Sequence, residues 1–320
     1  MAHFRTFRNT DPPRLVEVWN ETFTGRGAVG FSNSTPLERL VLGKPIFDPQ
    51  GLFVAEEDGT CIGMAHAALS QAPIPSGADG PVGVICLIGV RPAFRRRGIG
   101  SELLRRCETY LHEQGARKIF AGPHWPHNPF YLGLYGGCDS PGFLTSDAGA
   151  EPFLVRHRYR VVRKVLVMQR ALDHTVKIID PRFAPHRQRF QVRAGYPRSF
   201  SGFWKECILG FIEPAELVLE DKLTKEVVAR ALIWEMDGFG NKWQRPSIGI
   251  MGFEVQAKWQ RLGVGKYLLS QLLRQVQEQF FELAEVHLHE HNQPAIQFVK
   301  SLAFQHVDTG QIYERLALAD

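Results

Sequence analysis

The sequence predicts an α/β protein made of two similar halves, each built on a mixed β-sheet. An apolar strand, a turn with two glycines and an amphipathic helix follow one another at residues 82–111, and this order returns at residues 247–276. Two apolar runs separated by a turn precede each copy, as in a hairpin. The turn glycines Gly98 and Gly263 are 165 positions apart, about the length of one domain. We place the boundary near Leu172, which predicts domains over residues 1–172 and 173–320.

The first half begins with helical patterning and continues with a hairpin. Thr35 and Glu38 have capping-box spacing, and Pro36 suits the first position of a helix. Asp58-Gly59 separates two apolar runs, which is a strong hairpin signal. Helices are expected over 14–21, 35–42 and 101–111, and strands over 52–55, 61–67, 82–88, 118–121 and 161–168.

The second half repeats this order with a shorter connection before its last helix. Strands are expected over 216–220, 227–234, 247–255, 286–289 and 312–318, with helices beginning near 264 and 295. Counted from the glycine turns, the first half carries about 20 extra residues, within 124–147. The similarity between the halves is weakest over 174–215.

Composition fits a folded intracellular protein. The 320 residues are 44% hydrophobic and 22% charged, and no run of eighteen apolar residues or secretory leader is present. The five cysteines form no CxxC pair, which favours reduced thiols and a cytoplasmic location without a membrane partner. The net charge of +5 suits an anionic ligand, but no zinc-finger or RNP-type signature predicts a nucleic-acid partner.

The glycine turns are candidate anion sites. The first amides of a helix have no carbonyl partner within the helix, and the helix dipole adds positive potential there. Glycine lets the backbone approach a phosphate closely, and Arg95 to Arg97 add positive charge around the first turn. A single copy is also explained by the tight turn alone, but two copies in the same context favour a binding site.

Arg95-x-x-Gly98-x-Gly100 and Gln260-x-x-Gly263-x-Gly265 resemble motif A of the GCN5-related N-acetyltransferases (GNAT). Spacing around Phe153 and Phe298 likewise resembles the family's closing helix. The resemblance implies tandem GNAT domains that use acetyl-CoA as co-substrate and no metal. It assigns coenzyme binding to Ile88, Gly89, Val90, Arg95, Arg96, Arg97, Gly98, Ile99, Gly100 and Ser101 in the first half, and to Phe253, Val255, Gln260, Arg261, Leu262, Gly263, Val264, Gly265, Lys266 and Asn292 in the second.

The residues for acid–base chemistry are less clear than those for the coenzyme. The family commonly has a tyrosine on the closing helix to protonate the thiolate, but Leu154 and Val299 stand at those positions here. Tyr131 and Tyr135, in the first-half insertion, are substitute candidates or simply packed aromatic residues. Glu254 is a candidate base, or a solvated strand carboxylate.

Histidines suggest two metal sites at first sight. His124 and His127 have no further ligand at suitable spacing, and His287, His289 and His291 fit a half-exposed strand face equally well, so no metal is expected. Asn292 precedes Pro294 and also suits an ordinary helix cap.

These observations predict an N-acetyltransferase that transfers the acetyl group of acetyl-CoA to a primary amine of a small molecule or peptide. The alternative is a catalytically degenerate tandem that binds acetyl-CoA or a partner without turnover. The sequence indicates neither the acceptor nor the oligomeric state, and does not assign catalysis to one half.

Overall fold

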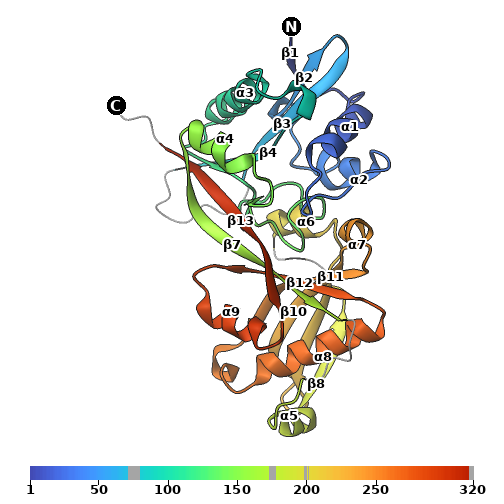
Figure 1. Cartoon of the computed structure of the whole chain (residues 1–320). Helices are drawn as coiled ribbons and strands as arrows, with labels where there is room; N and C mark the ends of the chain where they lie inside the picture. Colours follow the sequence, from blue (N-terminus) through green and yellow to red (C-terminus); the bar gives the residue numbers. More distant parts are fainter. Residues whose placement is uncertain (71–79, 173–177, 198–199, 201, 317–320) are drawn as a thin grey trace.

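The described residues of the computed structural model, 1–70, 80–172, 178–197, 200 and 202–316, form one 13-stranded sheet. The strand order is β1-β2-β3-β4-β5-β13-β7-β12-β11-β10-β9-β8, and β6 pairs with β13. Neighbouring strands are antiparallel except β4 with β5 and β11 with β12, which are parallel. Figure 1 shows two lobes, with the long strands β7 and β13 running between them.

The two halves exchange their last strands. β7 (Tyr159–Ala171) ends the first half but pairs with β12 (Leu283–His289) of the second, with Leu283 opposite Ala171. β13 (Gln305–Arg315) ends the second half but pairs with β5 (Lys118–Ala121) of the first, with Tyr313 opposite Ala121. β7 and β13 also pair with each other. Each half therefore completes the sheet of the other.

The first half has the helices and the hairpin that the sequence predicts, and its strands β4 and β5 are parallel. Its remaining elements are β1 (His3–Thr6), α1 (Pro12–Thr22), α2 (Thr35–Leu37), the π-helical turn η1 (Glu38–Leu42), η2 (Pro49–Gly51), β2 (Leu52–Glu57), β3 (Thr60–Leu69), β4 (Val82–Val90), η3 (Pro92–Phe94), α3 (Ile99–Glu113), β6 (Phe143–Leu144) and α4 (Ala150–Arg156).

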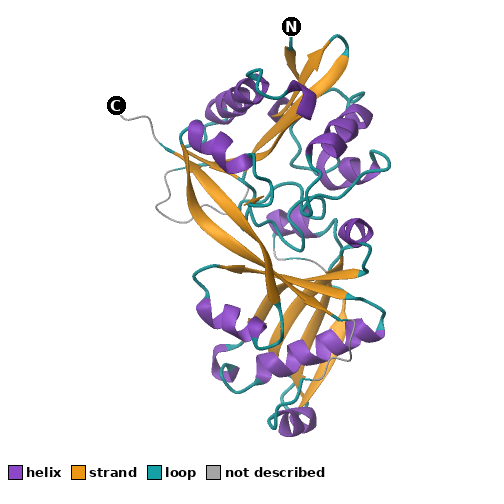
Figure 2. Cartoon of the chain, viewed as in Figure 1, coloured by secondary structure: helices purple, strands orange, loops and turns teal. Residues whose placement is uncertain are grey.

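The second half repeats this order and has additional short helices. Its remaining elements are α5 (Phe183–Arg189), β8 (Phe190–Gly195), α6 (Phe203–Leu209), β9 (Ala215–Asp221), β10 (Val227–Glu235), α7 (Asp237–Trp243), β11 (Ser247–Val255), η4 (Ala257–Trp259), α8 (Val264–Glu278) and α9 (Gln293–Lys300). Figure 2 shows the helices on the outside of the strands in both lobes.

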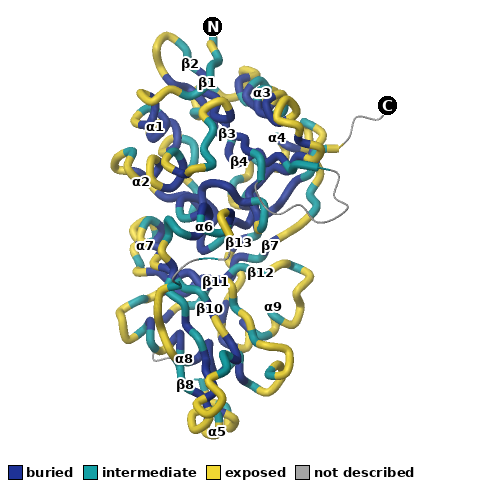
Figure 3. The backbone as a smooth tube through the Cα atoms, turned by 180° about the vertical axis from the view of Figure 1, so that it is seen from behind, coloured by how far each residue is buried: buried dark blue, intermediate teal, exposed yellow. Residues whose placement is uncertain are grey.

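One hydrophobic core is shared between the halves. It joins α1 residues such as Trp19, insertion residues such as Phe130, and second-half residues such as Trp204, Trp234 and Phe239. Two further cores lie under α3 and α8. Figure 3 shows the buried backbone continuing from one lobe into the other. The halves are therefore joined by packing as well as by strands.

Two local predictions are wrong. Thr35 is the first helical residue rather than the cap, and the cap residue Ser34 makes no side-chain bond to the helix, so the capping box does not form. The last strand begins at Gln305 rather than 312, because its outer face is polar and carries little apolar alternation. The predicted boundary at residues 172–173 adjoins segment 173–177, which lies outside the described residues.

Candidate functional site

The two glycine turns have the same backbone conformation. Gly98 has φ 82° and ψ −8°, and Gly263 has φ 85° and ψ −1°. Arg96 and Arg261 also have positive φ, at 64° and 63°. These are left-handed conformations, which glycine adopts without steric cost. Each turn follows a short 3-10 helix and places a glycine at the helix cap.

Free amides line both turns. Among the described residues, no carbonyl accepts the N–H of any residue from 96 to 101 or from 261 to 266. The first main-chain bonds beyond them run from Glu102 N to Gly98 O at 3.0 Å and from Tyr267 N to Gly263 O at 2.9 Å. Consecutive free amides at the start of a 15-residue helix form an anion site.

The first side chain of each motif braces its turn. Arg95 Nε donates to Val90 O, and Gln260 Nε2 donates to Val255 O, each at 3.0 Å. Arg97 is ion-paired with Glu57 at 2.7 Å. Part of the positive charge expected around the first turn is therefore neutralised by Glu57. The free amides are the main anion-binding feature of the turn.

The strands before the turns part at equivalent places. β4 and β5 are paired as far as Ile85 opposite Ala121, and β11 and β12 as far as Ile250 opposite Val286. Beyond these pairs, residues 86–90 and 251–255 stay paired with β3 and β10 on one side, but on the other side they have parted from β5 and β12. Such a fork exposes strand backbone to a ligand whose anionic end lies on the turn.

The helices α4 and α9 lie against the segments predicted to bind the coenzyme. A Cβ on Gly100 would lie 3.3 Å from the Phe153 ring, and the rings of Phe253 and Phe298 are 5.7 Å apart. His157, at the end of α4, shares a 2.9 Å hydrogen bond with the Ser101 hydroxyl. In the first half the closing helix therefore contacts the turn, and in the second half it contacts the strand that leads to the turn.

Both candidate tyrosines are buried. Tyr131 is 3% exposed, and its hydroxyl shares a 3.1 Å hydrogen bond with His66 Nδ1. Tyr135 is 6% exposed; its hydroxyl donates a short bond to Asp147 and accepts the Leu144 N–H at 3.0 Å. Burial raises the pKa of both phenols well above their ordinary value, so both stay protonated at neutral pH.

The Tyr135 hydroxyl is bonded to Asp147 and Leu144, two residues that line a cavity built by both halves. This cavity of about 390 Å³ has Asp147 and Glu151 in its wall. Burial raises the pKa of Asp147. Gln311 and Tyr313 come from β13 of the second half, and the other lining residues are Leu144, Thr145, Ala148, Pro152 and Val155.

A second hollow, of about 370 Å³, lies beside the first turn and is basic, although Arg315 is paired with Glu108 and Arg105 with Glu102. It is lined by Ser101, Leu104, Arg105, Glu108, Arg156, His157, Arg158 and Arg315. Sequence reasoning missed the arginines outside the motif. The run Arg156-His157-Arg158 at the end of the closing helix could have suggested them, whereas Arg315 reaches this place only through strand exchange.

The remaining candidate residues do not converge on one site. Glu254 is exposed, on the opposite face of β11 from Phe253 and Val255, as period-two alternation predicts. Asn292 caps α9, accepting the Ala295 N–H at 3.2 Å. Leu154 and Val299, at the positions of the family tyrosine, are both buried.

The histidines do not assemble as the spacing suggested. His291 lies beyond the end of β12 with an 89% exposed side chain, so the three alternating histidines do not share one strand face. His124 and His127 pair through their backbone, and their rings lie 5.4 Å apart. Burial lowers the pKa of His124 to about 3.

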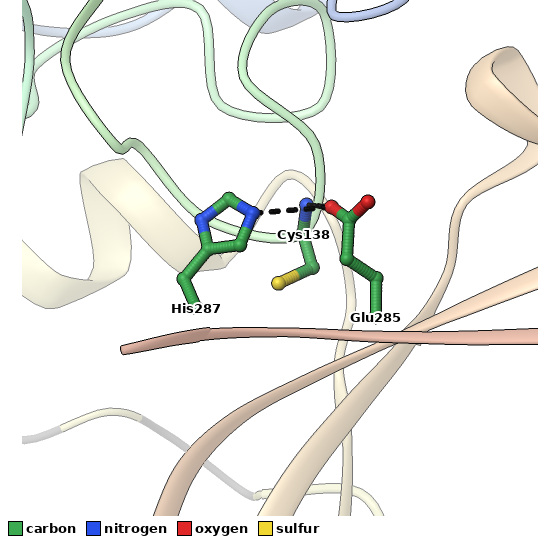
Figure 4. A group of neighbouring side chains, drawn as sticks. All are labelled: Cys138, Glu285 and His287. Atoms are coloured by element: carbon green, nitrogen blue, oxygen red, sulfur yellow. Dashed lines mark hydrogen bonds and ion pairs between the residues drawn. The ribbon is translucent and has the colours of Figure 1, made fainter. Parts of the chain in front are cut away.

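A different group, Cys138, Glu285 and His287, brings donor atoms within 4.8 Å of one another (Figure 4). Zinc accepts such a mixed set. Here, however, Glu285 already accepts bonds from the Cys138 N–H at 2.8 Å and from Gln169 at 2.6 Å. Its carboxylate also lies where a side chain on Gly137 would begin, so the loop packs directly against Glu285. We interpret the group as a hydrogen-bonded contact between the halves.

Comparison with known proteins decides the family. A model of the acetyltransferase (GNAT) family matches residues 13–135 and again residues 182–304. The chain belongs to this family. The tandem organisation predicted from the two turns is confirmed, and both matches include a glycine turn. No helix among the described residues has the length and apolar character needed to cross a bilayer.

Curated relatives of the chain are acetyltransferases. Mycothiol acetyltransferase of Thermobispora bispora is 36% identical over 123 residues, which are 37% of this chain and 39% of that protein. An acetyltransferase of Photorhabdus laumondii subsp. laumondii is 31% identical over 115 residues, covering 36% of this chain and 70% of that protein. The chain thus matches well under half the length of the mycothiol enzyme.

Solved structures share the whole architecture. A tandem GNAT protein from the clavulanic acid biosynthesis pathway superposes with a TM-score of 0.67 at 15% identity over 100% of both chains. The GCN5-related glucosamine N-acetyltransferase region of a fungal multi-domain β-N-acetylglucosaminidase gives 0.71 at 14% identity, over 98% of this chain and 38% of that chain. At such identities the likeness shows the tandem GNAT fold alone.

Proposed function

We propose that this protein is an N-acetyltransferase that moves the acetyl group of acetyl-CoA to a primary amine of a small molecule. The observation that carries the proposal is the first-half turn, where the amides of residues 96–101 have no partner among the described carbonyls. In this proposal they hold the pyrophosphate of the coenzyme, and residues 88–90 pair with its pantetheine arm. Family membership and the acetyltransferases among its relatives support the same activity.

The basic hollow beside the turn completes the donor site in this proposal. Arg156, Arg158 and Arg315 line it together with Ser101 of the turn. Coenzyme A carries a third phosphate on its ribose, and guanidinium groups bind phosphate through paired N–H donors. Arg315→Ala should therefore weaken acetyl-CoA more than dephospho-acetyl-CoA, which lacks that phosphate.

The acceptor is proposed to bind in the cavity next to Tyr135. Its volume of about 390 Å³ suits a small molecule, and the carboxylates of Asp147 and Glu151 suit a cationic amine. Asp147 would receive a proton from the ammonium. The neutral amine would then attack the thioester carbonyl and form the C–N bond. The nitrogen would lose its second proton to water as the C–S bond breaks and the thiolate leaves.

Tyr135 is proposed as the acid that protonates the departing thiolate. Its hydroxyl donates to Asp147, so the proton that Asp147 gains can return to the phenolate. Its ring lies 6.3 Å from that of Phe23, which covers Gly89 at the end of β4. Tyr131 is less suitable because its hydroxyl bonds to His66, away from this cavity. Glu254 remains a candidate base only for chemistry in the second half.

The test is release of free coenzyme A thiol from acetyl-CoA with a panel of small amines, including diamines, amino sugars and amino-acid amides. We expect turnover with at least one cationic amine. Tyr135→Phe should lower kcat at least tenfold while acetyl-CoA still binds, and Tyr131→Phe is the matched control. Tight acetyl-CoA binding without turnover across the panel would instead favour the non-catalytic alternative.

A further inference from the structure

The two glycine turns have the same backbone conformation, but different side chains lie against them. A Cβ placed on Gly98 would meet no atom within 4 Å. A Cβ placed on Gly263 would lie 2.9 Å from Nε and 3.0 Å from Cζ of Arg182. The first turn is therefore open beside its cap glycine, whereas a guanidinium lies against the second.

Asp180 holds this guanidinium in place and also neutralises the turn's own cation. Its carboxylate accepts bonds from Arg182 Nε at 2.8 Å and Nη2 at 2.7 Å. The same carboxylate lies 3.3 Å from Nζ of Lys266, in the first turn of α8 at the position that Ser101 has in α3. Only 6% of the Asp180 side chain is exposed. The Lys266 ammonium, which a phosphate would approach, is thus already paired with a carboxylate of the protein.

Helix α5 fixes this cover to the second half. His186 Nε2 lies 3.0 Å from the carbonyl oxygen of Leu262, within the turn. The Phe183 ring packs edge-on against Tyr267 of α8 at 5.4 Å. At the position of Tyr267, α3 carries Glu102, which pairs with its own helix neighbours Arg105 and Arg106. The first turn has no equivalent of α5 among the described residues.

The first half contacts the second half where β11 and β12 part. Where β4 and β5 part, Gly122 N bonds directly to Ile85 O at 3.1 Å. Where β11 and β12 part, the thiol of Cys138 donates to Ile250 O at 3.9 Å. Trp234 Nε1 donates to Cys138 O at 3.0 Å, and a Cβ on Gly249 would lie 2.8 Å from Cys138 Cβ.

A coenzyme held by its pyrophosphate on the second turn would run back along residues 255–251. Its thioester would then approach the point where β11 and β12 part, and there the thiol of Cys138 already contacts Ile250 O. Both ends of this path are therefore occupied by side chains of the same protein, which are held there by several hydrogen bonds and an ion pair.

We propose that the second half does not take up acetyl-CoA and that each chain binds one acetyl-CoA, at the turn formed by residues 95–101. This inference rests on the proposed function, and it assigns the coenzyme to one of two similar sites. The second half acts as a scaffold: it supplies Gln311 and Tyr313 to the acceptor cavity and Arg315 to the basic hollow.

The experiment is calorimetric titration of the intact chain and of Ser101→Glu with acetyl-CoA. A carboxylate in the first turn of α3 repels the diphosphate without changing a positive-φ glycine. We expect one acetyl-CoA per wild-type chain and none per Ser101→Glu chain, with unchanged circular dichroism. Two per wild-type chain, or one retained by Ser101→Glu, would overturn the inference. No binding by the wild type would overturn the proposed function itself.

A second measurement uses only the wild-type protein, so it does not require that a variant folds. Hydrogen–deuterium exchange of the wild type, with and without saturating acetyl-CoA, reports on the amides of both turns. Protection is expected over residues 96–101 and not over 261–266. Protection confined to residues 261–266, or equal at both turns, contradicts the assignment.

Discussion

Glu285 of the second half accepts the main-chain N–H of Cys138 in the first half at 2.8 Å, inside the contact between the halves. Gln169 donates to its other oxygen, and His287 Nε2 lies 3.1 Å away. Although burial alone raises the pKa of Glu285, the hydrogen bonds from His287 and Cys138 hold it below its ordinary value. The carboxylate is therefore ionised where it is fully enclosed.

Glu285→Gln should lower the free energy of unfolding by about 2–3 kcal/mol, because an amide presents a donor to groups that already donate. The wild-type carboxylate contributes stability above its ordinary pKa, and that contribution is lost as the pH falls through the folded value. Urea unfolding at several pH values measures both effects. Glu254→Gln, on the exposed face of β11, is the matched control and should change little.

The exchanged strands predict that neither half folds alone. Residues 1–172 lack the strand that pairs with β5, and residues 173–320 lack the strand that pairs with β12. We expect each fragment to aggregate or remain unfolded when expressed separately, and the two to co-purify as a folded pair when expressed together. A monomeric fragment with a cooperative unfolding transition would contradict this account.

Lys44 is a buried cation that costs stability. Its ammonium donates to Pro129 O at 3.0 Å and lies over the rings of Phe130 and Phe211. Burial lowers its pKa to about 8. Lys44→Met should raise the free energy of unfolding at pH 7 by about 1–3 kcal/mol.

The gain from Lys44→Met depends on pH in a defined direction. The unfolded lysine stays protonated up to about pH 10.4, whereas the folded one releases its proton from about pH 8, so wild-type stability rises between these values. The gain should therefore shrink over this window in thermal or urea unfolding. Lys300→Met, on the surface, should show no such convergence.

The burial of His66 predicts that the free energy of unfolding falls in acid. The ring is fully buried against Phe130, and burial lowers its pKa to about 3. Below about pH 6.5 the unfolded histidine is protonated and the folded one is not, so stability should fall by about 1.4 kcal/mol per pH unit until pH 3. His66→Gln should reduce this slope whatever its effect at neutral pH. His291→Gln, at an exposed site, should leave the slope as it is.

The sequence predicts the local elements of the site well because its signals are local. Gly98 and Gly263 are needed for positive φ in their turns, and this need, together with the apolar strand before each turn, identified both copies. The hairpin turn at Asp58-Gly59 is confirmed for the same reason. These features depend on a few neighbouring residues, which a sequence displays directly.

Long-range relationships could not be predicted in the same way. Alternation indicates that residues 161–168 and 312–318 are strands, but it does not indicate which strand each one pairs with. The cover of Arg182 over Gly263 and the entry of Cys138 into the second fork bring together residues far apart in the chain. Tyr135 and Asp147 both lie in the insertion, which has no periodic pattern, so only the structure shows that they are hydrogen-bonded to each other beside one cavity.

The exchanged strands also constrain how such a chain can change in evolution. A duplicated domain that has lost its ligand can usually be deleted, because the remaining copy is self-sufficient. Here deletion of the second copy would remove β13 from beside β5, leaving an unpaired edge and removing Arg315 and Tyr313 from the surviving copy. The second half is therefore required for the fold of the first half even if it binds no ligand of its own.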